Sequence, residues 1–145
     1  MKITIPYKPR VQQAYLHKEL PKYRYALLLL HRRAGKTTCV LNHIIREALL
    51  NKNHNPRYAY LAPTYKQSKS IAWDFLKFYA GKIPGVKFNE TELRCDLPNA
   101  SRITLLGAES AESLRGLYFD GIICDESASI QASVIEEILT PALSD

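Results

Sequence analysis

The sequence His31-Arg32-Arg33-Ala34-Gly35-Lys36-Thr37 stands between an apolar run and a helical pattern, and the rest of the chain is best understood from it. The run before it, residues 25–30, is continuously apolar, which is typical of a strand buried on both faces of a parallel sheet. After it, apolar residues recur at helical spacing as far as Leu50. We therefore predict a buried strand over residues 25–30, a polar turn, and a helix over about residues 35–50.

Gly35-Lys36-Thr37 at such a turn from strand to helix is typical of a phosphate-binding loop. In such a loop the backbone N–H groups and the helix N-terminus hold the phosphates, Lys36 neutralises the β and γ groups, and the Thr37 hydroxyl ligates Mg²⁺. Leu30 stands where the strict pattern has its first glycine, so the turn must be made differently. The tripeptide alone is a weak signal, because a chance Gly-Lys-Thr at a helix start looks the same.

Arg32 and Arg33 lie inside the loop, where most phosphate loops have small residues. Two guanidinium groups there offer bidentate donors to the β and γ phosphates, and we predict that Lys36 and Arg32 stabilise the charge on the transferring group. The loop residues predicted to bind nucleotide are Arg32, Arg33, Ala34, Gly35, Lys36, Thr37 and Thr38.

A second stretch, Gly121-Ile122-Ile123-Cys124-Asp125-Glu126, is an apolar strand that ends in paired carboxylates. We predict that Asp125 holds Mg²⁺ together with Thr37 and that Glu126 is the catalytic residue that polarises the attacking water. The alternative is an ordinary strand with a solvated acidic end, but the order of the two motifs favours an ATP-hydrolysing site. Such a site needs an additional strand between those of the two motifs, which residues 57–62 or 102–106 are predicted to supply.

The remaining hydrophobic patterns alternate between strands and helices. A short amphipathic helix is predicted over residues 11–20, a strand over 57–62, a helix around 71–79, a hairpin from 93–97 to 102–106, a strand over 119–124, and a last helix over 131–139 that ends at Pro141. We therefore predict an α/β fold, a P-loop NTPase of the additional-strand catalytic-glutamate, RecA-like type, whose mainly parallel sheet is flanked by helices.

Composition narrows the classes of protein further. The chain has 145 residues, enough for one domain, and its formal net charge of +6 favours a polyanionic partner. Since no apolar run approaches a membrane span and the N-terminus lacks an apolar signal core, we predict a cytoplasmic protein with no membrane segment. Cys39, Cys95 and Cys124 lie in apolar or alternating runs and are predicted to be reduced core thiols.

The loop and the strand ending Cys124-Asp125-Glu126 together resemble the ATPase domain of the large terminase subunit, the DNA-packaging motor of tailed bacteriophages. Two further stretches resemble motifs of the same family and occur in the same order. They are Leu61-Ala62-Pro63-Thr64-Tyr65-Lys66-Gln67 and Ser113-Leu114-Arg115-Gly116. The resemblance covers nearly the whole chain, and terminase phosphate loops often lack the first glycine.

The resemblance implies roles for two residues outside the loop. Pro9-Arg10-Val11-Gln12-Gln13 is similar to the adenine-contacting block of the family, in which a glutamine binds the base. Gln13 is the residue that we assign to nucleotide binding, with Gln12 as the alternative. Arg115 is the candidate arginine finger, a catalytic residue that reaches the nucleotide of the neighbouring subunit; the alternative is a surface arginine beside its loop.

The resemblance also implies a lead-in with the adenine-contacting block over residues 1–24 and a P-loop ATPase domain over residues 25–145. Family members continue into a coupling strand and a nuclease domain, so we expect a C-terminally incomplete domain. The implied cofactors are ATP and Mg²⁺. The implied partners are double-stranded DNA, a homo-oligomeric ring, a portal protein and a small terminase subunit, in the host cell cytoplasm. The alternatives are a helicase-like RecA-fold DNA translocase and a nucleotide-binding fragment that is inactive in isolation.

Overall fold

The chain alternates helices and strands, and the computed structural model describes residues 2–31 and 33–143. The helical elements are α1 (Val11–Glu19), η1 (Leu20–Lys22), α2 (Lys36–Leu50), α3 (Tyr65–Ser68), η2 (Lys69–Trp73), α4 (Asp74–Ala80), η3 (Ala108–Leu114), η4 (Ser127–Ser129), α5 (Ala132–Val134), η5 (Ile135–Leu139) and α6 (Thr140–Leu143). The strands are β1 (Arg57–Ala62), β2 (Lys87–Asn89), β3 (Arg94–Asp96), β4 (Arg102–Gly107) and β5 (Gly121–Cys124).

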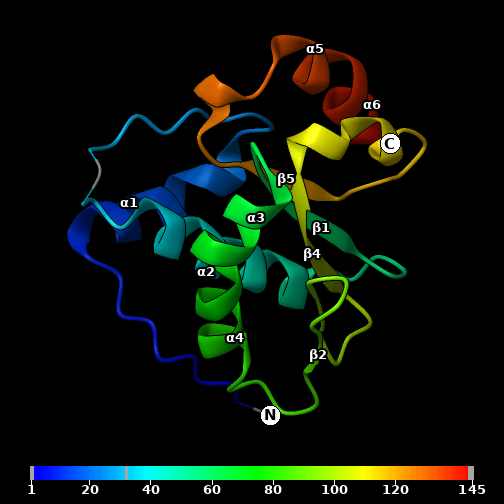
Figure 1. Cartoon of the computed structure of the whole chain (residues 1–145). Helices are drawn as coiled ribbons and strands as arrows, with labels where there is room; N and C mark the ends of the chain where they lie inside the picture. The colour runs from blue at the N-terminus through cyan, green and yellow to red at the C-terminus, as the bar shows by residue number, and fades with distance from the viewer. Residues whose placement is uncertain (1, 32, 144–145) are drawn as a thin grey trace.

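A sheet of five strands in the order β2-β3-β4-β1-β5 forms the centre of the fold (Figure 1). β1 is parallel to both β4 and β5, whereas β2 and β3 are antiparallel additions beyond β4. The predicted α/β fold, the strand over residues 57–62 and the hairpin are confirmed. The sheet is mixed rather than mainly parallel, because β3 and β2 add antiparallel strands at the edge opposite β5.

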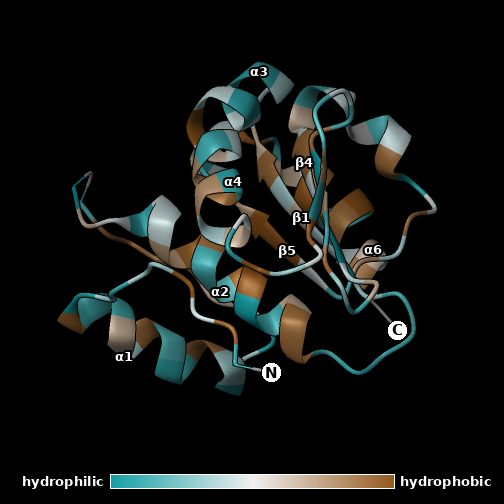
Figure 2. Ribbon diagram, turned by 90° about the horizontal axis from the view of Figure 1, so that it is seen from below, coloured by the Kyte–Doolittle hydropathy of each residue, from teal (hydrophilic) through white to brown (hydrophobic). Residues whose placement is uncertain are grey.

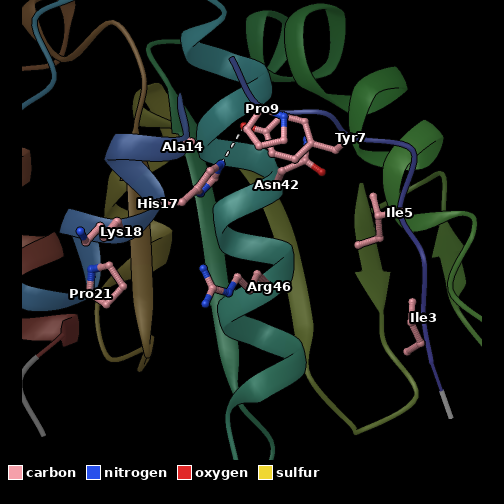
Figure 3. Close-up of a pocket in the computed structure, with 10 residues that line it drawn as sticks. All are labelled: Ile3, Ile5, Tyr7, Pro9, Ala14, His17, Lys18, Pro21, Asn42 and Arg46. Atoms are coloured by element: carbon pink, nitrogen blue, oxygen red, sulfur yellow. Dashed lines mark hydrogen bonds between the residues drawn. The ribbon is translucent and has the colours of Figure 1, made fainter. Parts of the chain in front are cut away.

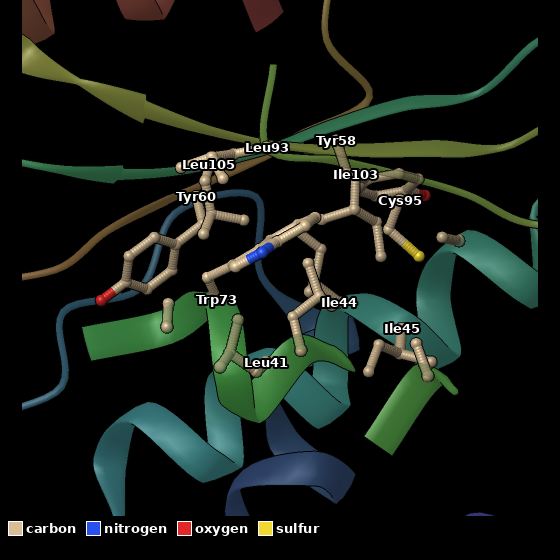
Figure 4. Packing of buried hydrophobic residues seen from close by; sticks show 14 of the residues in the cluster. Leu41, Ile44, Ile45, Tyr58, Tyr60, Trp73, Leu93, Cys95, Ile103 and Leu105 are labelled. Carbon is tan, nitrogen blue, oxygen red and sulfur yellow. The ribbon is translucent and has the colours of Figure 1, made fainter. Parts of the chain in front are cut away.

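β1 places alternate side chains in two separate cores, as the period of a strand requires. On one face Tyr58 and Tyr60 pack with α2 and with Trp73 (Figure 4). On the other face Leu61 packs with η3 and η5, where Ile138 is one of its neighbours. Figure 2 shows that the central strands are largely apolar and lie among helices that carry both polar and apolar residues. Each buried side chain of this size stabilises the fold by roughly 1.5–3 kcal/mol, so β1 is held firmly from both sides.

Residues 25–30 are not a strand, so the prediction of a buried strand before the loop is wrong. In the structure this run is irregular, and Tyr25, Leu27 and Leu29 are 59%, 72% and 83% exposed. A strand needs a hydrogen-bonded neighbour, and the described sheet ends at β5, whose one paired neighbour is β1. Apolar composition alone does not place a run in a sheet.

The predicted additional strand between the two motifs is likewise not found in the described part of the chain. β1 lies between β4 and β5, and β4 lies between β3 and β1. Because residues 25–30 stay outside the sheet, neither strand separates them from β5, and the prediction that one of the two does so is wrong.

The C-terminal helical segment continues past Pro141, where we predicted its end. Residues 132–143 form α5, η5 and α6 in succession, with wider turns over η5. The Thr140 hydroxyl donates to the Ile135 carbonyl at 2.8 Å, and a proline is tolerated in the first turn of a helix, as in α6. The extra turn places the Ala142 carbonyl 2.9 Å from the Phe119 N–H, which donates to it.

The N-terminal segment packs against the rest of the fold. Ile3 and Ile5 are partly buried against the core beneath α2, and the predicted helix over residues 11–20 is confirmed as α1, which contacts α2. Val11 and Tyr15 of α1 are 89% and 64% exposed, whereas Leu16 is half-buried and the buried residue of the helix is Gln13. The most buried residue of α1 is therefore polar, and the helix does not separate an apolar face from a polar one, contrary to the amphipathic pattern that we predicted.

The cysteines are free thiols, as predicted, with Cys39 and Cys95 buried and Cys124 half-buried. Burial raises the pKa of Cys95 to about 12 and that of Cys124 to about 11, so neither is a thiolate at neutral pH. Among the described residues, no group of three or more His, Cys, Asp and Glu side chains is placed to hold a metal ion. None of the described helices combines the length and the apolar character that crossing a membrane requires.

Candidate active site

The loop before α2 turns into the helix at Gly35. This residue has φ 75° and ψ 33°, a left-handed conformation that glycine adopts readily. A Cβ at this position would lie 2.5 Å from Gln13 Nε2 and would displace the end of that side chain, so the backbone conformation and the neighbouring side chain both favour glycine. The first N–H groups of a helix have no partner inside it and form its positive end. The start of α2 at Lys36 is thus suited to bind an anion.

Thr37, in the first turn of α2, contacts Asp125, the residue after β5. The Thr37 hydroxyl donates to Asp125 Oδ2 at 3.1 Å, across 88 positions of sequence. The backbone holds Asp125 in place, because its N–H donates to the Leu61 carbonyl at 2.8 Å and so continues the pairing of β1 with β5. The two sequence motifs therefore meet at one end of the parallel strands.

Tyr60 belongs to the same group, although our sequence analysis missed it. Its hydroxyl donates to Asp125 Oδ2 at 2.5 Å, and the residue, in the middle of β1, is 0% exposed. Burial, the hydrogen bond to Asp125 and the negative charges of Asp125 and Glu126 raise the pKa of Tyr60 well above its ordinary value, so the phenol stays protonated. One sequence feature could have identified Tyr60: it is a tyrosine within an apolar strand. A buried hydroxyl requires a hydrogen-bond partner, so such a tyrosine indicates a polar group nearby.

Glu126 follows Asp125 in an unusual backbone conformation. Its φ of 52° and ψ of 45° are left-handed, which costs a residue other than glycine on the order of 1–3 kcal/mol. Its N–H donates to Asp125 Oδ1 at 3.0 Å, and its side chain is exposed. Backbone strain of this kind collects at functional sites, which makes this turn a candidate functional feature.

Two side chains of the N-terminal segment hold the loop. Gln13 Nε2 donates to the Gly35 carbonyl at 2.9 Å, and Arg10 Nη1 donates to the Arg33 carbonyl at 3.1 Å. Gln13 Oε1 in turn accepts from the Arg10 N–H at 2.8 Å. Gln13 is 4% exposed whereas Gln12 is exposed, so Gln13 is the glutamine that contacts the loop. This contact with the loop backbone was not predicted from the sequence.

The other loop residues predicted to bind nucleotide differ in their exposure. Arg32 lies outside the described residues. Arg33 is exposed, Ala34 is buried, and Lys36 and Thr38 are half-buried.

Arg115 lies on the surface after η3, apart from the group around Asp125. Its Nε donates to Glu112 Oε2 at 2.6 Å, and its Nη2 lies 3.7 Å from Glu137 Oε2 on η5. The hydrogen bond from Arg115 lowers the pKa of Glu112. The structure thus gives Arg115 two acidic partners within its own chain and does not bring it to Thr37.

A row of aromatic side chains, Tyr7, His17 and His43, joins the N-terminal segment to α2, and Figure 3 shows the first two of them. The Tyr7 hydroxyl lies 2.7 Å from His17 Nε2, and His17 Nδ1 lies 3.2 Å from His43 Nδ1. Both contacts are satisfied when the histidines are neutral, with Tyr7 donating to His17 and His17 donating to His43. Burial lowers the pKa of both histidines, and the positive charge of Arg46 lowers both further. A cavity of about 700 Å³ lies beside this row, between residues 3–9, α1 and α2.

The oxygen atoms of Thr37 and Asp125 suit a divalent cation. Mg²⁺ prefers carboxylate, hydroxyl and water oxygens, and it is usually bound by one or two protein groups together with substrate phosphates. A hydroxyl and a carboxylate 3.1 Å apart, at the start of a helix that suits an anion, fit this pattern. The residues present therefore fit Mg²⁺ bound together with a phosphate ligand.

A left-handed glycine before a helix, a threonine in its first turn and an aspartate at the end of a parallel strand define a P-loop fold of the RecA-like type. The sequence pattern of the family described as "Terminase large subunit, T4likevirus-type, N-terminal" matches residues 27–142. The chain therefore belongs to this terminase family.

Solved structures of phage terminases have the same fold. The large terminase ATPase domain of Thermus phage P74-26 is similar with a TM-score of 0.72 and 25% sequence identity, over 96% of this chain and 61% of that chain. The large terminase of a thermophilic bacteriophage is similar with a TM-score of 0.76 and 16% identity, over 94% of this chain and 35% of that chain. The chain thus spans less than two thirds of the length of these relatives. No curated protein sequence is significantly similar to it.

Proposed function

We propose that this chain binds ATP with Mg²⁺ and hydrolyses it as the ATPase domain of a DNA-packaging terminase large subunit. The observation that carries the proposal is the 3.1 Å contact between Thr37 and Asp125, which joins the start of α2 to the end of β5. Family membership supports it, and so do relatives of similar fold: the large terminase of the thermophilic bacteriophage was solved with ATP-gamma-S and with ADP, at TM-scores of 0.63 and 0.64 to this chain.

In this proposal the loop neutralises and orients the phosphates. The N–H groups at the start of α2 and the Lys36 ammonium bind phosphate oxygens, and Arg32 and Arg33 donate to them as forks. Thr37 and Asp125 hold Mg²⁺, which when bound stabilises charge on the phosphates. Ala34, Gly35 and Thr38 complete the set that surrounds the phosphates.

Glu126 is the residue that we propose orients the attacking water. Its exposed carboxylate follows Asp125 directly, and the left-handed turn keeps it at the end of β5. Arg115 is proposed to stabilise the transferring charge in the site of a neighbouring subunit. For that role it must first leave Glu112 and Glu137, because both now bind its guanidinium group.

Gln13 has two tasks in the proposal. It holds the carbonyl of Gly35 through one N–H of its amide, and the second N–H remains for the adenine base. The partners proposed for the whole assembly are double-stranded DNA, further copies in a ring, a portal protein and a small terminase subunit, in the host cell cytoplasm. The family match favours this assembly over a helicase-like translocase.

The first test measures nucleotide binding by this chain, using a fluorescent ATP analogue with and without Mg²⁺. Lys36→Ala is expected to weaken binding at least tenfold, whereas Lys82→Ala, an exposed lysine far along the sequence, should bind as the wild type does. A wild-type chain that binds no nucleotide would overturn the proposed function.

The second test measures hydrolysis under single-turnover conditions. Glu126→Gln is expected to retain nucleotide binding and to lose hydrolysis, and Glu136→Gln serves as the matched control because Glu136 is an exposed glutamate outside the site. Equal hydrolysis rates in the two variants would remove Glu126 from the mechanism.

A second candidate function, nucleotide binding without hydrolysis by this chain alone, is favoured by one observation. Residues 25–30, which lead into the loop, stay outside the sheet, so strand pairing within the described chain does not brace the loop on that side. The same assays separate the two functions: tight binding of the analogue with no single-turnover hydrolysis supports the second candidate.

A further inference from the structure

Asp125 is oriented by donors from three parts of the chain. Its Oδ2 atom accepts from the Thr37 hydroxyl at 3.1 Å and from the Tyr60 hydroxyl at 2.5 Å. Its Oδ1 atom accepts from the N–H of Glu126 at 3.0 Å. Thr37 lies in the first turn of α2 and the Glu126 N–H lies in a strained turn, whereas Tyr60 lies in the middle of a strand that is paired on both sides. Tyr60 is therefore the donor on the most rigid element.

The position of the Tyr60 hydroxyl follows from strand packing. β1 is paired on both sides, with Tyr60 opposite Leu105 of β4 and opposite Ile123 of β5, two residues before Asp125. The Tyr60 ring is enclosed in the main core, and Figure 4 shows its hydroxyl at the edge of that cluster. A fully buried ring on a central strand has little freedom, so the hydroxyl presents a donor at one fixed point.

We propose that Tyr60 is a positioning residue for the divalent cation: its hydroxyl holds the Asp125 carboxylate in the orientation that receives Mg²⁺. This inference rests on the proposed function, because it assigns a role within the same nucleotide site. Groups that hydrogen-bond to a metal ligand fix its orientation, and their loss usually lowers metal affinity about 10- to 100-fold. Tyr60 is placed to do so for Asp125 before nucleotide arrives.

The alternative is that Tyr60 acts only in the core, and Tyr58 provides a matched comparison. Tyr58 lies two positions earlier on the same face of β1. Its hydroxyl accepts from Asn51 Nδ2 at 3.0 Å and donates to the Glu47 carbonyl at 3.4 Å, so its hydrogen bonds go to groups other than Asp125. Tyr58→Phe and Tyr60→Phe therefore remove the same atom from the same strand, and they differ in whether the Asp125 carboxylate loses a donor.

The experiment titrates Mg²⁺ at a fixed concentration of fluorescent ATP analogue and measures the Mg²⁺ concentration for half-maximal binding. Tyr60→Phe is expected to raise this concentration about 10- to 100-fold. Tyr58→Phe should leave it within about twofold of wild type. Direct binding of Mn²⁺, followed by electron paramagnetic resonance in the presence of the unlabelled nucleotide, provides a second readout and should show the same order.

Each outcome decides between the possibilities. A larger Mg²⁺ requirement for Tyr60→Phe alone supports the positioning role, even if both variants lose similar stability in urea. The same Mg²⁺ requirement for Tyr60→Phe and Tyr58→Phe, in chains that bind nucleotide, overturns it and leaves the proposed function standing. A wild-type chain that binds neither nucleotide nor Mn²⁺ overturns the proposed function and this role together.

Discussion

Gln13 Nε2 donates a hydrogen bond to the Gly35 carbonyl at 2.9 Å, so a side chain of α1 rests against the turn that begins α2. The space between them is small, because a Cβ on residue 35 would lie 2.5 Å from that nitrogen. Glycine is favoured there by the positive φ and also by the closeness of the Gln13 side chain. Through this contact the N-terminal segment becomes part of the candidate nucleotide site.

Gly35→Ala is therefore expected to destabilise the fold and to weaken nucleotide binding. A left-handed alanine costs about 1–2 kcal/mol, and displacement of Gln13 adds a similar amount. Urea unfolding should show a total loss of roughly 2–4 kcal/mol. Gly116→Ala is the control, since Gly116 has φ +81° and a Cβ added there would meet no atom within 4 Å. Equal losses in both variants would contradict a contribution from the Gln13 contact.

Gln13→Leu is expected to keep the volume of the side chain while removing its hydrogen bonds. The Gly35 carbonyl and the Arg10 N–H then lose partners, which costs about 1–3 kcal/mol in a partly buried place. We expect lower affinity for a fluorescent ATP analogue, measured by titration. Gln12→Leu, at the exposed neighbour, should change stability by less than about 0.5 kcal/mol. If Gln12→Leu weakened binding more than Gln13→Leu, the choice between the two glutamines would be reversed.

The burial of His17 and His43 makes the free energy of unfolding depend on pH. Burial lowers both pKa values from 6.5, so below about pH 6.5 the unfolded chain binds protons that the folded chain does not. The free energy of unfolding is thus highest above that pH and falls as the pH drops from 6.5 through the lowered values. Arg46 opposes protonation further, whereas Glu47, 3.8 Å from His43 Nε2, partly favours it.

Thermal unfolding across about pH 5 to 8 checks this expectation. His43→Phe removes one of the two titrating rings and should flatten the decline of melting temperature on the acid side. His54→Gln, at an exposed histidine, should leave the profile as in the wild type. A wild-type melting temperature that rose toward acid pH would show that the sign is wrong.

Residues 25–30 are expected to exchange their backbone amide hydrogens rapidly, because they form no sheet pairing within the described chain and several of their side chains are exposed. Hydrogen exchange followed by mass spectrometry should show protection there more than about a hundredfold below that of β1, which is paired on both sides. Strong protection of residues 25–30 in the isolated chain would mean that they occupy a strand position after all.

Much of the architecture follows from local patterns. The strand over 57–62 and the helix that begins at Lys36 agree with expectation, since period and capping residues are local properties. The prediction of a strand over residues 25–30 is wrong because a continuously apolar run has no period. Such a run does not indicate which other part of the chain packs against it. The end of the last helix was misplaced because a proline in the first turn of a new helix does not stop it, as Pro141 shows.

The amino-acid sequence alone specifies the chemistry of each motif. It contains a glycine at the start of a helix, a lysine and a hydroxyl after it, and paired carboxylates after an apolar strand. Only the tertiary structure decides which other side chains join them. Tyr60 is 65 positions from Asp125 and Gln13 is 22 positions from Gly35, and no local period links such pairs. The register of β1 against β5 and the packing of α1 on α2 bring them together, because hydrogen bonds of this kind depend on distances that only packed elements define.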